Sequence, residues 1–429
     1  MKKSENTVGN SRFDITDNIL ILACDVSKDR ISLYTETPGG GIDRVFDNKT
    51  GAVEKELRQF NLFISGGRYR AAAVAAEPTG VCHDSLFRTA RRLGMYTACV
   101  SAEAVAKMRV IETNDTGKTD IKDPRVIFTP ARIGKTLHHR IFEEPWSLLR
   151  EWNTIYDMAD QDVVQARCVI HSLIKRLFPD FGMKKDFICG KSGKILLSEY
   201  GFDPLRITAS GEYSFHSTVK FLSPRIREKT VSKIYEHARM SVKRGLSARQ
   251  SALISVNLLQ RFEDLECHLL RKSEARKSME VLYNEIRVID PGLPMADRRF
   301  ITTFHLSRII GETGPLSDFR NHNKLMRFSG LNLCERQSGL YRGKTHISKR
   351  GRPLLRKILK LTVLPPVKKD GICGEYYRKK RDNDKMPGTE ALAVAAGHFL
   401  KMLYAVYKSG SGFDETRIFV CESQFKEAA

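Results

Sequence analysis

Four acidic side chains occupy positions from which they could hold metal ions for the cleavage of phosphodiester bonds. Asp25 and Glu77 each end a short apolar run, and Asp120 and Asp123 lie three residues apart. An acid at the end of a buried strand is poorly placed for packing and well placed for chemistry. Converging carboxylates repel one another unless cations lie between them. The four acids therefore predict a site for two hard divalent ions, in the first instance Mg²⁺.

Each acid also has an ordinary structural interpretation. An Asp at the end of a strand is commonly a turn residue or a helix cap. Asp123 precedes Pro124, and a proline disfavours the helical conformation of the residue before it. Asp123 is therefore also a candidate N-cap with Pro124 as the first helical residue, which would turn its carboxylate in another direction. The order of the four acids along the chain favours the metal site.

The balance of charge points to an acidic partner. The chain has 429 residues, with 72 Lys and Arg against 50 Asp and Glu and a formal net charge of +22. Nucleic acid is the leading candidate, because each cation placed on a phosphate releases a counterion. An anionic membrane is the alternative, but no apolar stretch is long enough to span one. The length suits two or three domains, and the 41% apolar content supports packed cores.

The nine cysteines and the first residues both fit a reducing cytoplasm. The cysteines include no Cys-x-x-Cys pair, so the sequence predicts neither a structural zinc site nor a disulfide framework. Residues 1–6 are polar and are followed by no apolar signal core, which argues against secretion.

Residues 18–150 alternate between strand-like and helix-like segments, which predicts an α/β domain. The predicted strands are 19–24, 31–35, 44–47, 71–76 and 95–100, and the predicted helices are 52–63, 81–93 and 101–111. The turn-rich stretch 37–41 makes the first three strands a meander. Three strands followed by strand–helix units is the order of the ribonuclease-H-like fold.

Two long helices are predicted in the middle of the chain. Apolar residues recur at helical spacing over 146–178, where Pro179 ends the pattern, and over 247–288, with Ser247 as the N-cap. Around the less regular residues 182–230, these helices predict an antiparallel coiled coil. Because the heptads are imperfect, an ordinary helical subdomain stays open. Residues 289–408 form a third unit that closes with an apolar helix.

Taken together, these segments resemble the DEDD transposases of the bridge-RNA-guided insertion sequences, the insertion sequence 110 type, and the Piv-like invertases. The matching segments read Cys-Asp-Val-Ser-Lys at 24–28, Ala-Glu-Pro-Thr-Gly-Val at 76–81, Lys-Thr-Asp-Ile-Lys-Asp at 118–123, Gln-Ser-Gly at 337–339 and Ile-Ser-Lys-Arg-Gly at 347–351. They stand in the family's order and span most of the chain.

The resemblance implies a fold and a chemistry. It implies a RuvC-like, ribonuclease-H-like domain whose acids Asp25, Glu77, Asp120 and Asp123 bind Mg²⁺, and a mostly helical C-terminal transposase domain whose nucleophile is Ser338. That serine would attack donor and target DNA and form a covalent phosphoserine link. The family works as a homo-oligomer, a dimer or tetramer, and a structured guide RNA specifies its DNA. A bacterial or archaeal cytoplasmic protein that acts on nucleoid DNA is expected.

The resemblance also sets the expected domain boundaries. They are a tail at 1–17, the RuvC-like domain at 18–145, the coiled-coil region at 146–288, the serine-bearing domain at 289–408 and a tail at 409–429.

Ser338 and the cations around it also have ordinary structural interpretations. Ser338 precedes Gly339, an ordinary turn pair, and Ser329 is a rival that also precedes a glycine. Tyr341 could stack on a base or simply pack. The flanking cations could clamp phosphates or form a solvated basic face; they are Arg336, Arg342, Lys344, Lys349, Arg350, Arg352 and Arg356.

Three functions remain in competition at the level of sequence. The first is an RNA-guided DNA recombinase with a serine nucleophile. The second is a hydrolytic, Holliday-junction-resolvase-like nuclease in which the acids activate water and the serine is irrelevant. The third is a noncatalytic nucleic-acid-binding relative, which the presence of all four acids and Ser338 disfavours. A covalent protein–DNA adduct separates the first from the second.

Overall fold

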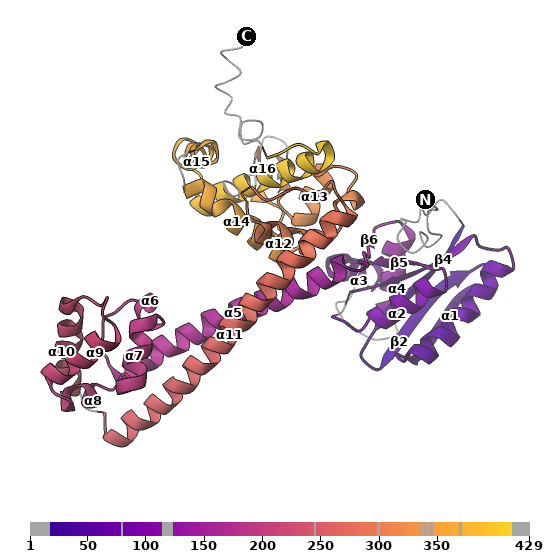
Figure 1. Cartoon of the computed structure of the whole chain (residues 1–429). Coiled ribbons are helices and arrows are strands. Elements are labelled where there is room, and N and C mark those ends of the chain that lie inside the picture. The colour runs from indigo at the N-terminus through magenta and orange to yellow at the C-terminus, as the bar shows by residue number, and fades with distance from the viewer. Residues whose placement is uncertain are drawn as a thin grey trace, which may run out of the picture. The chain divides into compact units, whose positions relative to one another are not determined.

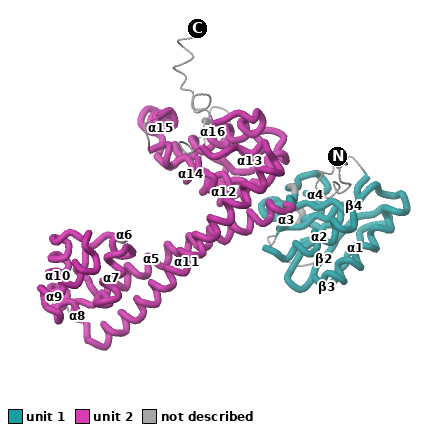
Figure 2. The backbone as a smooth tube through the Cα atoms, in the orientation of Figure 1, with its two compact units in different colours: residues 1–141 teal, residues 142–429 magenta. Residues whose placement is uncertain are grey.

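The structure is a computed structural model in which the chain divides into two compact units, Met1–Ile141 and Phe142–Ala429 (Figure 2). It describes residues 18–78, 80–113, 123–243, 246–297, 301–334, 337–338, 341–342, 346–368 and 371–413. The predicted fold class is confirmed to this extent: the N-terminal unit is mixed α/β and the rest is mostly helical.

The N-terminal unit is built on one mixed sheet, to which its described residues contribute six strands in the order β3-β2-β1-β4-β5-β6. The strands are β1 (Ile19–Val26), β2 (Arg30–Thr37), β3 (Gly40–Asp47), β4 (Ala71–Ala76), β5 (Tyr96–Cys99) and β6 (Leu137–His138). The first three form the predicted antiparallel meander, and β4 and β5 continue the sheet in parallel to β1.

Helices cover both faces of this sheet, which explains the continuous apolar runs of its central strands. Alternate residues of β1 point to opposite faces. Leu20 and Leu22 pack with the helices α1 and α2, while Ile21 and Ala23 pack with residues of α3 and α4. The helices are α1 (Thr50–Ser65), α2 (Asp84–Arg92), α3 (Ala102–Thr113) and α4 (Asp123–Arg132).

The C-terminal unit contains two long helices that pack side by side, α5 (Trp146–Leu177) and α11 (Ala248–Ile289) (Figure 1). Asp160 lies against Lys272, and Asp162 lies against His268. Residue numbers rise along one helix as they fall along the other, so the two helices run antiparallel. The predicted start of α11 is confirmed: Ser247 is the N-cap, and its hydroxyl accepts a hydrogen bond from the backbone of Gln250 in a capping box.

The expectation of irregular structure at 182–230 is wrong. This part of the chain forms short helices, α6 (Lys185–Ile188), α7 (Lys191–Tyr200), α8 (Pro204–Ala209), α9 (Glu212–Leu222) and α10 (Glu228–Val242). They surround a core that includes Leu196, Phe202 and Phe215, packed with ends of α5 and α11. The helices α6 to α9 have 4, 10, 6 and 11 residues, too few for a long apolar periodicity, and α10 lies mostly beyond residue 230.

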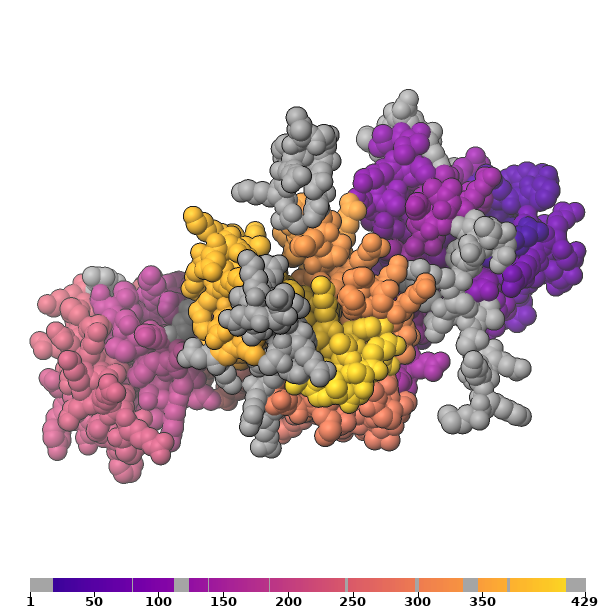
Figure 3. All heavy atoms as spheres, turned by 90° about the horizontal axis from the view of Figure 1, so that it is seen from above, coloured from indigo at the N-terminus to yellow at the C-terminus, as the bar shows by residue number. Residues whose placement is uncertain are grey.

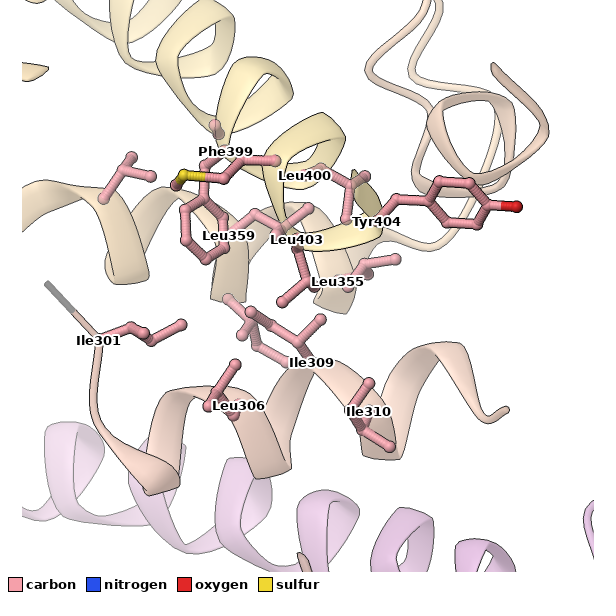
Figure 4. Packing of buried hydrophobic residues seen from close by; sticks show 14 of the residues in the cluster. Ile301, Leu306, Ile309, Ile310, Leu355, Leu359, Phe399, Leu400, Leu403 and Tyr404 are labelled. Atoms are coloured by element: carbon pink, nitrogen blue, oxygen red, sulfur yellow. The ribbon is translucent and has the colours of Figure 1, made fainter. Parts of the chain in front are cut away.

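The other core of this unit joins both long helices to the C-terminal helices. Figure 4 shows Leu306 and Ile309 of one helix facing Leu355 of a second and Leu403 of a third. The elements are α12 (Thr303–Thr313), η2 (Leu316–Asp318), α13 (His322–Ser329), β7 (Leu333–Cys334), β8 (Gln337–Ser338), β9 (Tyr341–Arg342), β10 (His346–Ile347), α14 (Pro353–Lys368), α15 (Ile372–Arg378), η3 (Lys379–Asn383) and α16 (Gly388–Ser409). The predicted closing apolar helix is α16.

Candidate active site and nucleic-acid interface

Two of the predicted metal ligands lie at the same edge of the sheet. Asp25 is the seventh residue of β1, and Glu77 directly follows β4. The strands are parallel, with Cys24 opposite Ala76, so the register puts Asp25 beside Glu77. Both side chains are half-buried. Burial, and then the charge of Asp25, raise the pKa of the Cys24 thiol, which keeps this neighbour protonated and unreactive.

Asp123 is the first residue of α4, and Arg109 of α3 holds its side chain. Its side chain is 4% exposed, and Oδ1 accepts hydrogen bonds from Nη2 and Nε of Arg109 at 2.7 and 3.2 Å. Pro124 follows in the first turn of the helix, as its missing N–H allows. The carboxylate is therefore oriented by α3, and a metal ion would compete with this guanidinium for it.

The structure describes three of the four predicted metal ligands. Asp120 lies outside the described residues. Within the described part of the chain, Asp25, Glu77 and Asp123 do not form a group of three with ligand atoms within 4.8 Å of one another; His83, Asp84 and His139 do. Arg91 approaches this second group, donating a hydrogen bond to the carbonyl of His139 at 2.6 Å. The strand register thus brings two of the four acids together.

The predicted nucleophile lies in a short hairpin. Ser338 is the last residue of β8 and pairs with Tyr341 of β9; the structure places this backbone but not these side chains. The rival Ser329 has a structural role. It is fully buried at the end of α13, where its hydroxyl donates to the carbonyl of Met326 at 2.8 Å and accepts from the backbone of Leu331 at 3.3 Å.

Two glycines let separate segments approach closely beside this hairpin. Gly330 and Gly351 have φ values of 69° and 148°. A Cβ on Gly351 would lie 2.5 Å from the carbonyl oxygen of Phe328 and 2.7 Å from the nitrogen of Gly330. The contact joins the end of α13 to the start of α14. The Ser-Lys-Arg-Gly motif therefore includes a packing requirement that only glycine meets.

The predicted phosphate-binding cations divide into two groups. Lys349 and Arg350 are exposed, whereas Arg352 donates from Nε to the buried carboxylate of Glu312 at 2.7 Å. Arg356 donates to the carbonyl of Ser329 at 3.0 Å, and burial lowers its pKa. Arg352 and Arg356 thus have structural partners in addition to any ligand. Arg336 and Lys344 lie outside the described residues, and the side chain of Arg342 is not placed.

A buried polar network that the sequence analysis missed fastens α12 and α14 to α5. Asn153 donates to Glu312 at 3.1 Å and accepts from Arg308 at 2.9 Å. Arg308 and Lys357 also reach one carboxylate oxygen of Asp157, at 3.3 and 2.8 Å. Paired and hydrogen-bonded charges of this kind specify a single docking of helices. The only sequence signal was Arg308 within an apolar helical stretch.

The region around the serine hairpin matches a known family. Residues 301–378 match the model of the Transposase IS116/IS110/IS902 family. This segment is therefore similar to transposases of the IS110 type. The match runs from the start of α12 to the end of α15 and includes β8, Gly330 and Gly351. Among curated proteins, none matches the chain significantly.

The match supports the family that the motifs of the sequence analysis resemble. Transposases act on DNA, and the net charge of +22 on this chain suits a polyanionic partner. Among the helices that the structure describes, none is both long and apolar enough to cross a membrane.

Proposed function

We propose that this chain is a transposase that cuts and rejoins donor and target DNA with a Mg²⁺-bound acidic tetrad and the nucleophile Ser338, under the guidance of a structured RNA. The observation that carries the proposal is the parallel register of β1 and β4, which puts Asp25 beside Glu77. The match at 301–378 supports DNA as the substrate.

The strand order supports a ribonuclease-H-like, RuvC-like fold for the N-terminal unit. Three antiparallel strands are followed by two that extend the sheet in parallel, with helices on both faces. In this arrangement the ends of β1 and β4 form one edge. An acid on each strand end is then presented to the same point, as metal-assisted phosphodiester chemistry requires.

The described acids fit a hard divalent cation. Asp25 and Glu77 offer carboxylate oxygens, the donors that Mg²⁺ prefers, and both are half-buried at a sheet edge. Asp123 would join them, and its pairing with Arg109 neutralises the buried carboxylate in the absence of the ion. Bound Mg²⁺ would supply charge stabilisation at the scissile phosphate.

The serine step conserves atoms and charge. The Ser338 oxygen forms a bond to phosphorus as the bond from phosphorus to the leaving DNA oxygen breaks. The serine proton is lost to a base and the leaving oxygen gains one, so the strand break is stored as a phosphodiester on the serine. Attack by the incoming strand's hydroxyl reverses the step and restores the backbone.

The acids and the serine belong to different compact units. We assign the serine that meets one acidic domain to another subunit of a dimer or tetramer. The exposed Lys349 and Arg350 beside the serine-bearing segment would hold phosphates of the DNA or of the guide RNA.

The test is denaturing electrophoresis of the full chain incubated with Mg²⁺ and labelled, nicked DNA. Wild type should give a covalent protein–DNA band that Ser338→Ala abolishes while DNA binding persists. Ser329→Ala is the matched control and should keep the band, because Ser329 is buried and bonded to the backbone. A band that persists in Ser338→Ala refutes the nucleophile. Clean cleavage without any band favours the hydrolytic resolvase.

A further inference from the structure

A cavity of about 420 Å³ opens between α13, α16 and the strands β7 and β10 of the C-terminal domain. Its size falls within the range typical of small-molecule sites. In the space-filling view the orange and yellow surfaces of these C-terminal elements adjoin (Figure 3). Of the motifs in the sequence analysis, the 347–351 segment reaches this cavity, through Ile347.

The cavity combines an apolar wall with a cationic rim. Met326, Leu331 and Val394 line it together with Arg327 and Lys401, both exposed. None of the described residues that line it is acidic. An apolar wall with cations at the mouth suits a ligand that has a flat, weakly polar body and a negative group, which is the chemistry of a nucleotide.

Polar groups in the cavity are held in place by residues outside it. The Asn332 side-chain oxygen accepts a hydrogen bond from Ser348 at 2.7 Å, and Tyr376 and His398 share a hydrogen bond of 2.8 Å. Fixed amide and imidazole groups are suited to the polar edge of a base. The wall is adaptable elsewhere, because Met326 lies against Gly397, where a Cβ would be 3.1 Å from the methionine methyl.

The cavity is continuous with the segment that carries the serine. Leu333 of β7 and Ile347 of β10 line it and face each other in the antiparallel pair. These strands bracket the residues that include β8 and Ser338. A nucleotide held here would therefore contact both strands that flank the serine-bearing segment.

We propose that this cavity binds one nucleotide of the DNA strand, unstacked from its neighbours, with its base against Met326 and Val394 and its phosphate at Arg327 and Lys401. The inference rests on the proposed DNA strand-transfer function and names a subsite for its substrate. Unstacking costs free energy that a fitted pocket can return through stacking and hydrogen bonds.

Cross-linking tests the site directly. The full chain is irradiated with single-stranded DNA that carries 5-iodo-deoxyuridine at successive positions, and the linked peptide is identified by mass spectrometry. We expect one position to link to Met326 or His398. Links confined to other elements overturn the site, and equal linking of the matching 5-iodouridine RNA overturns the assignment to DNA.

Two variants separate charge from shape. Arg327→Gln with Lys401→Gln removes the rim charge, and Val394→Phe fills the cavity while the charge remains. Each should weaken single-stranded DNA binding, measured by fluorescence anisotropy, by roughly tenfold, the scale of one stacked base. Arg320→Gln with Lys324→Gln is the charge-matched control from exposed positions outside the cavity. Equal affinity of Val394→Phe and wild type, with unchanged thermal unfolding, overturns the proposal.

The cross-link and the phosphoserine adduct can fail separately. A cross-link at Met326 without any adduct would leave the nucleotide site in place and remove the serine chemistry. An adduct without the cross-link would do the opposite.

Discussion

At the scale of single residues, the pairing of Asp123 with Arg109 shows how a buried carboxylate is held by an ionic partner. The side chain is 4% exposed, and an unpaired charge at that depth would be costly. The guanidinium satisfies one carboxylate oxygen. If the tetrad binds Mg²⁺, the ion would have to share the Asp123 carboxylate with the Arg109 guanidinium or displace the guanidinium from it.

The first prediction concerns Asp25. Asp25→Asn removes one of the converging charges, so we expect a folded protein with an unchanged or slightly higher melting temperature. DNA cleavage with Mg²⁺ should be lost, because a neutral amide is a weak ligand for a hard cation. The measurement is cleavage of labelled DNA with and without EDTA. Full cleavage by the variant would contradict the metal site.

The second prediction concerns His305. Burial, followed by the charges of Arg308 and Arg276, lowers its pKa below the ordinary 6.5. The unfolded chain therefore takes up a proton that the folded chain resists, and stability should fall as pH drops below about 6.5. Urea unfolding at pH 7.5 and 5.5 measures the loss, which should be smaller in His305→Asn. The exposed His322→Asn is the control and should behave as wild type.

At the scale of elements, the close approach of the backbone at Gly330 to the backbone at Gly351 anchors the serine-bearing segment. Gly330 ends α13, and Gly351 precedes α14. Their backbones come so close that a Cβ on either would meet the other segment. The polar network through Asn153 and Glu312 then ties the same region to α5. These contacts anchor the chain on both sides of the segment that contains Ser338.

The third prediction follows from this close backbone contact. Gly351→Ala should destabilise the C-terminal unit by roughly 2 kcal/mol, since it adds a backbone clash to an unfavourable φ. Gly412→Ala, at a position with nothing within 4 Å of an added Cβ, is the matched control and should be nearly neutral. Chemical denaturation compares the two. If both variants lower the free energy of unfolding by the same small amount, the backbones at Gly330 and Gly351 can move apart at little cost.

At the scale of the whole molecule, charge dominates the encounter with nucleic acid. The excess of 22 positive charges is not cancelled by internal pairing, and cations placed on phosphates release counterions on binding. Affinity should therefore depend strongly on salt for any DNA sequence. Sequence choice must come from a different source, for which we propose the guide RNA.

The fourth prediction separates these contributions. DNA affinity should fall by about 10³-fold between roughly 50 and 200 mM salt, as followed by anisotropy. Purification of the protein from its host should enrich a structured noncoding RNA. A shallow salt dependence would contradict the phosphate-binding role of the basic residues. The absence of an enriched RNA would argue against guidance and leave the cleavage chemistry untouched.

Local features of the chain were sufficient to predict most elements of the structure. The apolar runs that Asp25 and Glu77 end are strands, and Ser247 caps the longest helix, because periodicity and caps depend only on residues a few positions apart. The same reasoning failed at 182–230, where the helices α6 to α9 have only 4, 10, 6 and 11 residues.

The contacts were decided by the tertiary structure. That Asp25 lies beside Glu77 depends on the parallel pairing of β1 with β4, and that Asp123 pairs with Arg109 depends on how α3 and α4 pack. The sequence predicts that Arg352 binds phosphate but does not predict its hydrogen bond to Glu312, which lies 40 residues away in the chain. Residue types and order predict which groups can react. Their partners are set by long-range pairing and burial, which no local pattern encodes.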